Sequence, residues 1–418
     1  MSDLQGLRRW WAGPLDVEGL ALDAVDAVRA ATRAVAAVRG LTVDLSTSTE
    51  LIAASFAAVE HLRVAGRAPA GWAPFSGFFE ANDGWARSQG NYPHHAAAIA
   101  GTLNVAAKED LIEAARELSA DEIERRVTAA GGIATVVRSE QLWANHAHAR
   151  ATAGEAWRTT TIGVARQQLG KLPAGLPLEG VRVLDLTRVI AGPTCSQVLA
   201  CLGADVLRID PPQTPELLEQ YLSNGMRKRS AQVDLAASME TVRRELLAHA
   251  DVVLVGYRPG ALARFGLDAD SLAADHPTMI IGSLSAWGER GPWRDRRGFD
   301  SIVQAATGIA DVYRHGNRPG ALPVQALDHA TGHVMAAGVM AVLASGNGGV
   351  VRTNLLGAAR ELLARPRSNG EEVTLDVPTV TVASPYGEVV TVPPPLLLDG
   401  RYADGDINGY GVSRLAWA

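Results

Sequence analysis

The stretch VRVLDLTRVIAGPTCSQVLACLGADVLRID, residues 181–210, decides the fold of this protein. It opens with a short apolar run at 181–186, continues through small and apolar residues at 191–204, and closes with a second short run at 205–210. The short apolar runs predict buried strands, and the longer segment between them predicts a helix. Two strands joined by a helix form a βαβ unit, in which the strands lie parallel in one sheet.

The same alternation continues toward the C-terminus. We expect helices at 239–250 and 261–277, and strands at 251–257 and 279–288. Alternating strands and helices predict an α/β fold with a parallel, Rossmann-like sheet. The glycine fingerprint of dinucleotide-binding proteins, G-x-G-x-x-G, does not follow the first strand, so the sequence offers no dinucleotide site.

The chain before and after this pattern differs in composition. Residues 17–39 are rich in alanine with apolar positions at helical spacing, and 170–180 is a stretch of Gly, Pro and Leu typical of a domain boundary. The last residues are irregular and Pro-rich. We therefore expect three parts: a helical and small-domain-like region at 1–170, a Rossmann-like domain at 171–365, and a wrapping tail at 366–418.

Composition excludes several classes of protein. A chain of 418 residues, of which 47% are hydrophobic, has room for two substantial domains. The formal net charge of -6 leaves no basic excess to neutralise a nucleic-acid backbone, so no nucleic-acid partner is expected. No apolar run reaches the roughly 18–20 residues that span a bilayer. With no signal-peptide pattern and only two cysteines, the sequence predicts a cytoplasmic protein without a membrane span.

Five segments, taken in order, resemble one known family. They are LEGVRVLDLTRVIAGPTCSQVLACLGADVLRIDPP (178–212), RKRSAQVDL (227–235), ADVVLVGYRPGALARFGLD (250–268), SLSAWGERGPW (283–293) and RGFDSIVQAATGI (297–309). Their content and order resemble the family III CoA-transferases, the group that includes formyl-CoA transferase, carnitine CoA-transferase and α-methylacyl-CoA racemase. The resemblance implies an enzyme that moves CoA between carboxylic acids, with acyl-CoA as a substrate and no tightly bound cofactor.

Two earlier segments are similar to the small domain of the same family. They are PFSGFFEANDGWARSQGN (74–91) and AAGGIATVVRSEQLWANHAHARA (129–151). In the usual family these pieces follow the Rossmann-like half, whereas here they precede it. The resemblance therefore implies a Rossmann-like sheet domain plus a smaller α+β domain, with permuted segment order. Family members form interlocked homodimers, so a homodimer is expected.

The family's nucleophile is an aspartate, and the matching residue is Asp328 in LPVQALDHATGHVMAAG (322–338). Without the resemblance, Asp328 is either the N-cap of an apolar helix or a reactive carboxylate, and the local sequence leaves both open. The resemblance implies that Asp328 attacks the thioester and forms first an anhydride and then an aspartyl-CoA thioester. We expect the helix N-terminus to hold this carboxylate ionised.

CoA carries a diphosphate and a 3′-phosphate, so an acidic protein that binds it must gather local positive charge. From the resemblance and from their places at strand ends, we expect the CoA-binding residues to be Arg188, Val189, Ile190, Ala191, Arg227, Lys228, Tyr257, Arg258 and Arg264. For each arginine or lysine, a solvated surface position is an equally open interpretation. Ser76 and Gly77 are candidates for a cover that excludes water from the intermediates, or they form an ordinary turn between aromatic residues.

Three departures from the family keep other functions open. Ile190 stands where formyl-CoA transferases have Gln, Arg188 where they have His, and Phe299 where the racemases have a His. Racemisation needs an acid and a base on opposite faces of the α-carbon, so Phe299 favours transfer. The alternatives are an acyl-CoA racemase or isomerase, and a non-catalytic acyl-CoA-binding subunit. His329 and His333 have metal-binding spacing, but the glutamate of H-E-x-x-H is missing, so we expect no metal.

Overall fold

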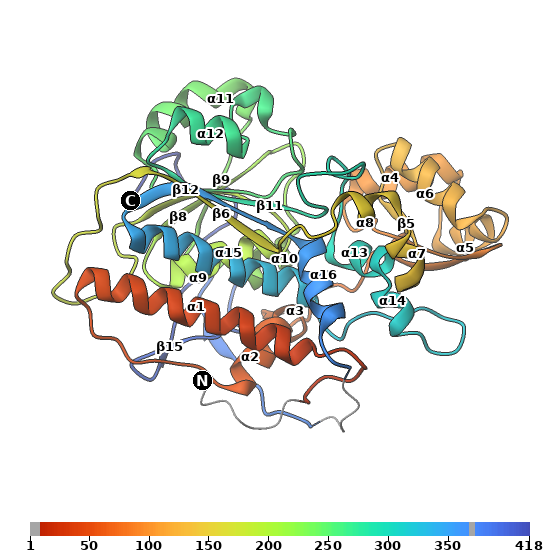
Figure 1. The fold of residues 1–418 in the computed structure, drawn as a ribbon, viewed down its shortest axis with the longest axis horizontal. Helices are drawn as coiled ribbons and strands as arrows, with labels where there is room; N and C mark the ends of the chain where they lie inside the picture. The colour runs from red at the N-terminus through yellow and green to blue at the C-terminus, as the bar shows by residue number, and fades with distance from the viewer. Residues whose placement is uncertain (1–8, 368–372) are drawn as a thin grey trace.

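A seven-stranded sheet forms the centre of the molecule (Figure 1). The structure is a computed structural model that describes residues 9–367 and 373–418. The strands run in the order β6 (Arg158–Ala165), β12 (Asn347–Asn354), β11 (Ile280–Ser285), β10 (Val252–Val255), β7 (Arg182–Leu186), β8 (Asp205–Asp210) and β9 (Arg229–Gln232). Neighbouring strands are parallel except β12 and β6, which pair antiparallel. This sheet confirms the predicted α/β fold class.

The predicted βαβ unit is present as β7, α9 (Ala191–Cys201) and β8, and the two later predicted strands are β10 and β11. These strands could be predicted because both faces of a parallel sheet are covered, so that a strand such as β10 is apolar and buried along its whole length. The sequence did not predict β6 or β12. β6 is Thr-rich and β12 opens with Asn-Gly-Gly, a pattern more typical of a turn.

Helices cover the sheet in layers (Figure 1). On one face lie α9 and the 20-residue α15 (Ala326–Ser345), and α1 (Val17–Arg39) packs against α15 as a further layer. On the other face lie α11 (Leu235–Thr241) and α12 (Ala269–Asp275). By length and composition α15 is apolar enough to cross a membrane, but nearly all of it is buried inside the protein. It is the central helix of the main hydrophobic core.

A smaller domain lies beyond one end of the sheet (Figure 1). Its antiparallel sheet consists of β3 (Gly77–Ala81), β4 (Gly84–Ser88) and β5 (Ala134–Val136). Its helices are α4 (Pro93–Leu103), α5 (Lys108–Arg116) and α6 (Ala120–Ala129). Phe79, Ile99 and Ile123 belong to a hydrophobic cluster separate from the main core. This part has the composition expected of the small α+β domain.

The expected boundary at residue 170 does not divide the molecule in space. β6 precedes that residue and forms the edge of the large sheet, and α1, near the start of the 1–170 region, packs on α15. Residues on both sides of the boundary therefore build the 171–365 domain. The Gly/Pro/Leu composition of 170–180 marks a surface connection from β6 to β7 rather than a division between domains.

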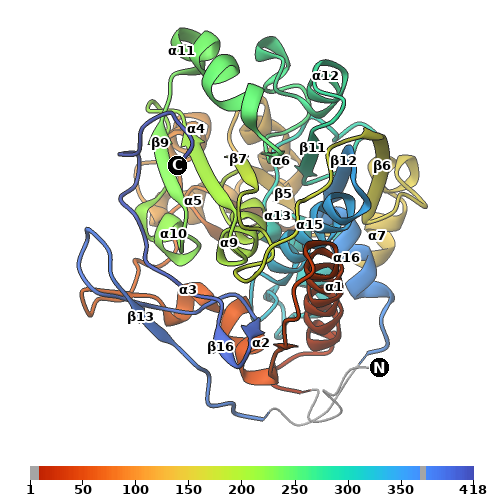
Figure 2. The same cartoon turned by 90° about the vertical axis from the view of Figure 1, so that its left-hand side faces the viewer.

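The C-terminal segment runs along the outside of the Rossmann-like half (Figure 2). β14 (Val389–Thr391) pairs with β2 (Arg63–Val64), and β15 (Leu397–Leu398) pairs with β1 (Leu45–Ser46). Further along, an isolated bridge joins Val412 to Ala231 of β9. Residues 373–418 of the expected tail thus extend two small sheets and cover the β9 edge, while 368–372 lie outside the described residues.

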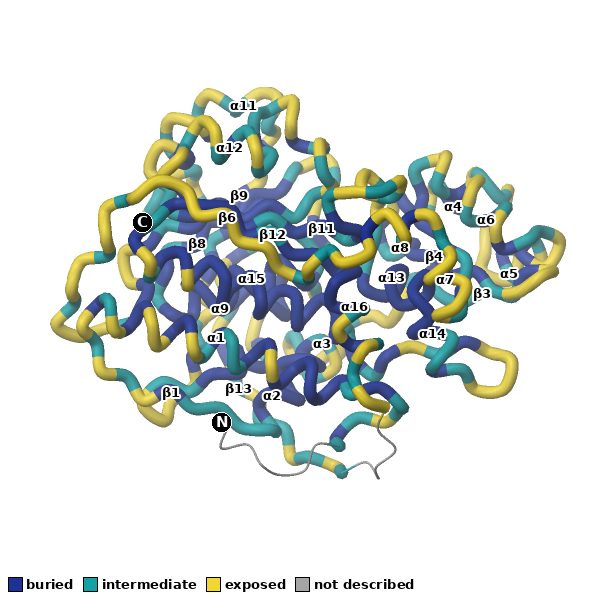
Figure 3. The backbone as a smooth tube through the Cα atoms, in the orientation of Figure 1, coloured by how far each residue is buried: buried dark blue, intermediate teal, exposed yellow. Residues whose placement is uncertain are grey.

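Burial differs sharply between the two edges of the large sheet. β6 is exposed at all eight positions, whereas β8 near the other edge is almost wholly buried (Figure 3).

The remaining elements are α2 (Thr49–Phe56), α3 (Ala58–His61), α7 (Glu140–Ala144), α8 (Ala147–Ala151), α10 (Leu218–Ser223), α13 (Asp300–Thr307), α14 (Ile309–Val312), α16 (Leu355–Ala364), β13 (Val380–Val382), β16 (Arg401–Tyr402), a π-helical turn at Val242–Leu246 and 3-10 turns at Leu247–His249 and Ala263–Phe265.

Candidate active site

A cavity of about 410 Å³ lies at the carboxyl ends of β7, β10 and β11, where the small domain meets the sheet. Ligands bind at this end of parallel sheets because the connecting loops and helix N-termini converge there. The cavity brings together six of the predicted site residues, which are Arg188, Val189, Ala191, Tyr257, Arg258 and Asp328. Among the described residues that line it, Asp328 is the only carboxylate.

Asp328 stands in the first turn of α15 but does not cap the helix. The N-cap position is Gln325, whose side chain makes no capping bond. The capping group is instead Asp300, at the start of α13, whose Oδ2 accepts the backbone N–H of Asp328 at 3.0 Å. The Asp328 carboxylate itself has no hydrogen-bond partner within the described part of the chain. It is thus left available to a molecule in the cavity.

The expectation that the helix terminus holds Asp328 ionised is wrong. Burial raises the pKa of Asp328 well above its ordinary value, and the neighbouring Asp300 carboxylate raises it further. Burial also raises the pKa of Asp300, to about 6, although the N–H groups of Asp328 and Leu327 and the amide of Gln304 oppose this. Two buried carboxyl groups so close together cannot both ionise easily. The pair therefore keeps one proton, which can reside on either aspartate.

This pair should make the stability of the protein fall as pH rises. Both folded-state pKa values lie above the ordinary aspartate value of 3.8, so the folded chain holds these protons more tightly than the unfolded chain. The stabilisation is complete below about pH 4 and is lost as pH rises through about 6 and beyond. Asp328→Asn should therefore raise the free energy of unfolding by about 1–3 kcal/mol near pH 8 and leave it unchanged near pH 4. Denaturant titrations at both pH values measure this, and an equal gain at both would contradict it.

The turn between β7 and α9 carries backbone strain next to Asp328. Val189 has a φ of +70°, which a β-branched residue adopts only when its surroundings impose it. Its N–H donates to Glu216 Oε2 at 2.9 Å, which holds the strained conformation. Three residues on, a Cβ at Gly192 would lie 2.2 Å from the Thr187 side chain, so only glycine fits there. The turn places Val189 and Ala191 in the cavity wall.

A buried charge network supports this turn. Arg208 is completely buried and donates to Asp210 (2.8 and 3.0 Å) and to Glu216 (2.8 Å). Glu216 also accepts the hydroxyl of Tyr92, and Arg188 lies 3.7 Å from it. Burial alone would raise the pKa of Glu216, but Arg208 and Arg188 outweigh it and lower the value to about 2. The network fixes Arg188 and Tyr92 against each other, with the guanidinium 5.1 Å from the ring centre.

Two further arginines at the cavity are not paired. Arg258 and Arg297 are exposed, and neither forms an ion pair with any carboxylate in the described residues. Burial and the charge of Arg258 together lower the pKa of Arg297. By contrast, the guanidinium of Arg296 forms an ion pair with the carboxylate of Glu124 at 2.9 Å. Arg258 and Arg297 thus form a site of uncompensated positive charge, which suits a phosphate.

The other predicted residues lie outside this cavity. Arg264 lines an adjoining cavity of about 220 Å³, which shares Tyr257 and Ala261 with the first. Ile190 is buried at the N-cap of α9, and Arg227 is exposed and donates to the carbonyl of Asp404. Each of these positions is within or beside the sheet edge, but only Arg264 reaches a cavity.

The side chains of Lys228 and Ser76 form hydrogen bonds with other residues of the protein. Lys228 is completely buried, and its ammonium donates to the Pro193 carbonyl (3.1 Å) and to Ser196 (2.9 Å) in the first turns of α9. Ser76 donates to Asn91 (2.6 Å) and holds the loop before β3, while Gly77 begins that strand. Neither Ser76 nor Gly77 lines the cavity.

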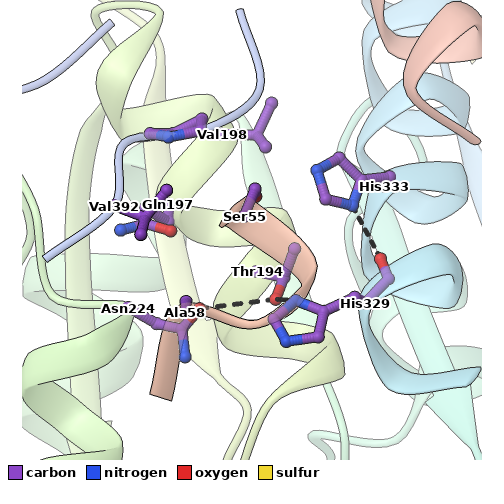
Figure 4. A pocket seen from close by; sticks show the side chains of 10 residues that line it. Ser55, Ala58, Thr194, Gln197, Val198, Asn224, His329, His333 and Val392 are labelled. Carbon is purple, nitrogen blue, oxygen red and sulfur yellow. Dashed lines mark hydrogen bonds between the residues drawn. The ribbon is translucent and has the colours of Figure 1, made fainter. Parts of the chain in front are cut away.

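His329 and His333 line a separate small pocket that shares no lining residue with the Asp328 cavity (Figure 4). The Nδ1–H of His333 donates to the carbonyl of His329 at 2.7 Å, and Phe56 stacks on the His333 ring. His329 Nδ1 lies 3.4 Å from the Thr194 hydroxyl. In the described ranges, no three His, Cys, Asp or Glu side chains form a group that could hold a metal ion.

Sequence reasoning missed several residues of the cavity. Arg296 and Arg297 line the cavity, and Asp300 holds the Asp328 backbone behind it; all three lie within or beside the RGFD segment, so the resemblance marked their location without assigning them a role. His94 and His95 form a visible doublet in the sequence, but no motif assigns them a role. The position of the small domain beside the sheet places them in the wall of the Asp328 cavity.

Comparison with known proteins identifies the segment that contains this cavity. Residues 178–373 match the family model described as CoA-transferase family III. The probable fatty acyl-CoA transferase Rv3272 of Mycobacterium tuberculosis is 37% identical over 182 residues, which are 40% of this chain and 46% of that protein. The succinate–glutarate CoA-transferase of Agrobacterium fabrum is 32% identical over 218 residues, 46% of this chain and 54% of that protein.

A solved structure matches a similar share of this chain. The crystal structure of Rv3272 matches 46% of this chain and 56% of its own, with 36% identity and a TM-score of 0.42. The chain thus spans about half the length of the curated relatives it matches. Residues 178–373, which carry β7 to β12 and Asp328, are thus the part of the chain that is similar to CoA-transferase family III.

Proposed function

We propose that this protein transfers CoA from an acyl-CoA donor to a carboxylic acid, with Asp328 as the covalent nucleophile. The observation that carries the proposal is the cavity, in which one buried carboxylate, without a hydrogen-bond partner among the described residues, shares the lining with Arg188, Arg258 and Arg297. A carboxylate nucleophile suits the reaction because the anhydride and thioester that it forms preserve the reactivity of the donor.

The reaction proceeds in four balanced steps. Asp328 reacts in its deprotonated form: the carboxylate attacks the thioester carbonyl, the C–S bond breaks, and CoA leaves as the thiolate. The thiolate then attacks the Asp328 carbonyl of the mixed anhydride, which releases the donor acid and leaves an aspartyl-CoA thioester. The acceptor carboxylate attacks this thioester, the C–S bond breaks, and a second anhydride forms as CoA leaves again as the thiolate. Finally the thiolate attacks the acceptor carbonyl, releasing the new acyl-CoA and restoring Asp328.

The two adjoining cavities provide a continuous path for CoA. The thioester lies at Asp328, and the phosphates lie near Arg258 and Arg297, which lack carboxylate partners among the described residues. The adjoining cavity, lined by Leu262, Phe265 and Arg264, has apolar walls for a base and one cation at its rim. Most of a flexible ligand would thus be held by the Rossmann-like half.

Removing either unpaired arginine should weaken CoA binding. Arg258→Gln and Arg297→Gln are each expected to raise KM for acyl-CoA about tenfold, to change kcat less than about twofold, and to reduce the salt dependence of KM. Steady-state kinetics at several ionic strengths measure all three effects. Arg401→Gln removes the same charge from an exposed position in β16 outside the cavity. A similar rise in KM for this control would show that net charge, and not the site, is responsible.

The direct test incubates the protein with a panel of acyl-CoAs and carboxylic acids and follows new acyl-CoA by mass spectrometry. Transfer to at least one acceptor is the expected result. Exchange of the α-proton without transfer would favour the racemase or isomerase alternative, and CoA binding without either reaction would favour a binding subunit.

The proposal includes a permuted chain and a homodimer. The permutation is supported by the small domain, which precedes the family segment in the chain yet packs at its cavity. Light scattering on the purified protein should give the mass of two chains.

A further inference from the structure

His95 brings an imidazole from the small domain into the Asp328 cavity. It lies in the first turn of α4, its residue is only 5% exposed, and it lines the cavity together with Asp328. Its ring meets the Phe299 ring edge-on, with centroids 6.0 Å apart. Phe299 immediately precedes Asp300, which holds the backbone of Asp328. His95 is therefore fixed beside the chain segment that positions the nucleophile.

The surroundings of the ring select one protonation state. Nδ1 of His95 is buried and has no hydrogen-bond partner in the described part of the structure. If the ring proton is on Nε2, the buried Nδ1 carries only a lone pair. The imidazolium form and the other neutral tautomer would instead bury an N–H group without a partner at Nδ1. Burial, His94, Arg297 and Arg188 lower the pKa of His95 to about 3. The ring is thus neutral at physiological pH, with Nε2–H as its donor.

We propose that His95 is a further catalytic residue, whose Nε2–H donates to the thioester carbonyl oxygen as Asp328 attacks it. This inference rests on the proposed function. As the new C–O bond forms, the carbonyl electron pair moves onto oxygen, and the resulting oxyanion accepts the hydrogen bond. No proton is transferred, and collapse of the oxyanion breaks the C–S bond and releases the thiolate.

A neutral donor is suited to this position for an electrostatic reason. An arginine in contact with Asp328 would form an ion pair with the nucleophile and reduce its reactivity. Arg188 and Arg296 are engaged by Glu216 and Glu124. A neutral imidazole leaves the carboxylate free and still stabilises the charge that develops on the carbonyl oxygen.

The experiment measures the single-turnover rate of CoA adduct formation on Asp328 in three variants. His95→Phe removes the donor and retains a ring, and should slow the adduct about 10²–10³-fold with little change in KM for acyl-CoA. His95→Gln restores an N–H donor and should recover at least about tenfold of this loss. His276→Gln, on the C-cap of α12 and outside the cavity, should match the wild type.

The outcomes separate this inference from the function on which it rests. If the wild type forms the adduct and both His95 variants form it equally fast, His95 is not a donor, although the transferase function stands. If His95→Phe abolishes α-proton exchange in D₂O and leaves adduct formation intact, His95 is a base and the oxyanion role is wrong. If the wild type forms no adduct with any acyl-CoA, the proposed function fails first.

Discussion

Replacing Asp328 with Asn will abolish CoA transfer and leave CoA binding largely intact. The amide cannot form the mixed anhydride, so the rate should fall by at least about 10³-fold. Binding should persist because the arginines of the cavity wall, Arg258 and Arg297, are untouched. Asn has nearly the same shape as Asp, and it also removes the repulsion from Asp300, so the variant is expected to fold.

Intact-protein mass spectrometry provides the measurement. In the presence of a suitable acyl-CoA, the wild type should gain the mass of CoA less one water, and peptide mapping should place the gain on Asp328. Asp275→Asn is a matched control, because this aspartate is exposed at the end of α12. An adduct that persists in Asp328→Asn would move the nucleophile to another residue.

Breaking the buried network at Glu216 will cause the largest loss of stability. Glu216→Ala leaves the completely buried Arg208 with one carboxylate partner, and leaves the Val189 N–H and the Tyr92 hydroxyl without their acceptor. A buried charge that loses its partner typically costs about 3–5 kcal/mol of unfolding free energy. Because Val189 and Arg188 line the cavity, activity should fall as well.

Urea unfolding of Glu216→Ala and Glu216→Gln measures this effect. Since the folded-state pKa of Glu216 is lowered to about 2 from 4.5, its contribution is complete above about pH 4.5 and is lost as pH falls through about 2. Glu219→Ala is the control, because Glu219 is exposed in α10, three residues away. A loss below about 1 kcal/mol for Glu216→Ala would show that water replaces the carboxylate.

The parts of this structure that could be predicted from sequence are those with a local cause. β7, α9 and β8 follow from apolar runs that are buried on both faces, and Asp328 follows from motifs in a fixed order. The electrostatics of Asp328 could not be predicted, because Asp300 lies 28 residues earlier and approaches only when α13 packs beside α15. The contact of Tyr92 with Glu216 spans 124 residues and depends on how the small domain docks.

The prediction for Lys228 shows the limit of a motif. Its basic neighbours suggested a phosphate contact, yet the ammonium is buried beneath α9 and holds the carbonyl of Pro193. A linear pattern states which residue type is needed and not which way its side chain points. The position of His95 likewise has no signal in the linear sequence, since its environment is built by residues from distant segments.

The packing of α1 on α15 also has a consequence for how the chain folds during synthesis. α1 carries a buried face rich in Leu, Val and Ala, and its main partner emerges from the ribosome roughly 300 residues later. β6 likewise cannot pair until its partner β12 has been synthesised, and nearly the length of the family segment separates the two strands in the chain. Until α15 has been made, the buried face of α1 lacks its native cover, and the nascent chain exposes apolar surface of the kind that chaperones bind. The central helix therefore both carries Asp328 and is the element whose synthesis allows the core to close.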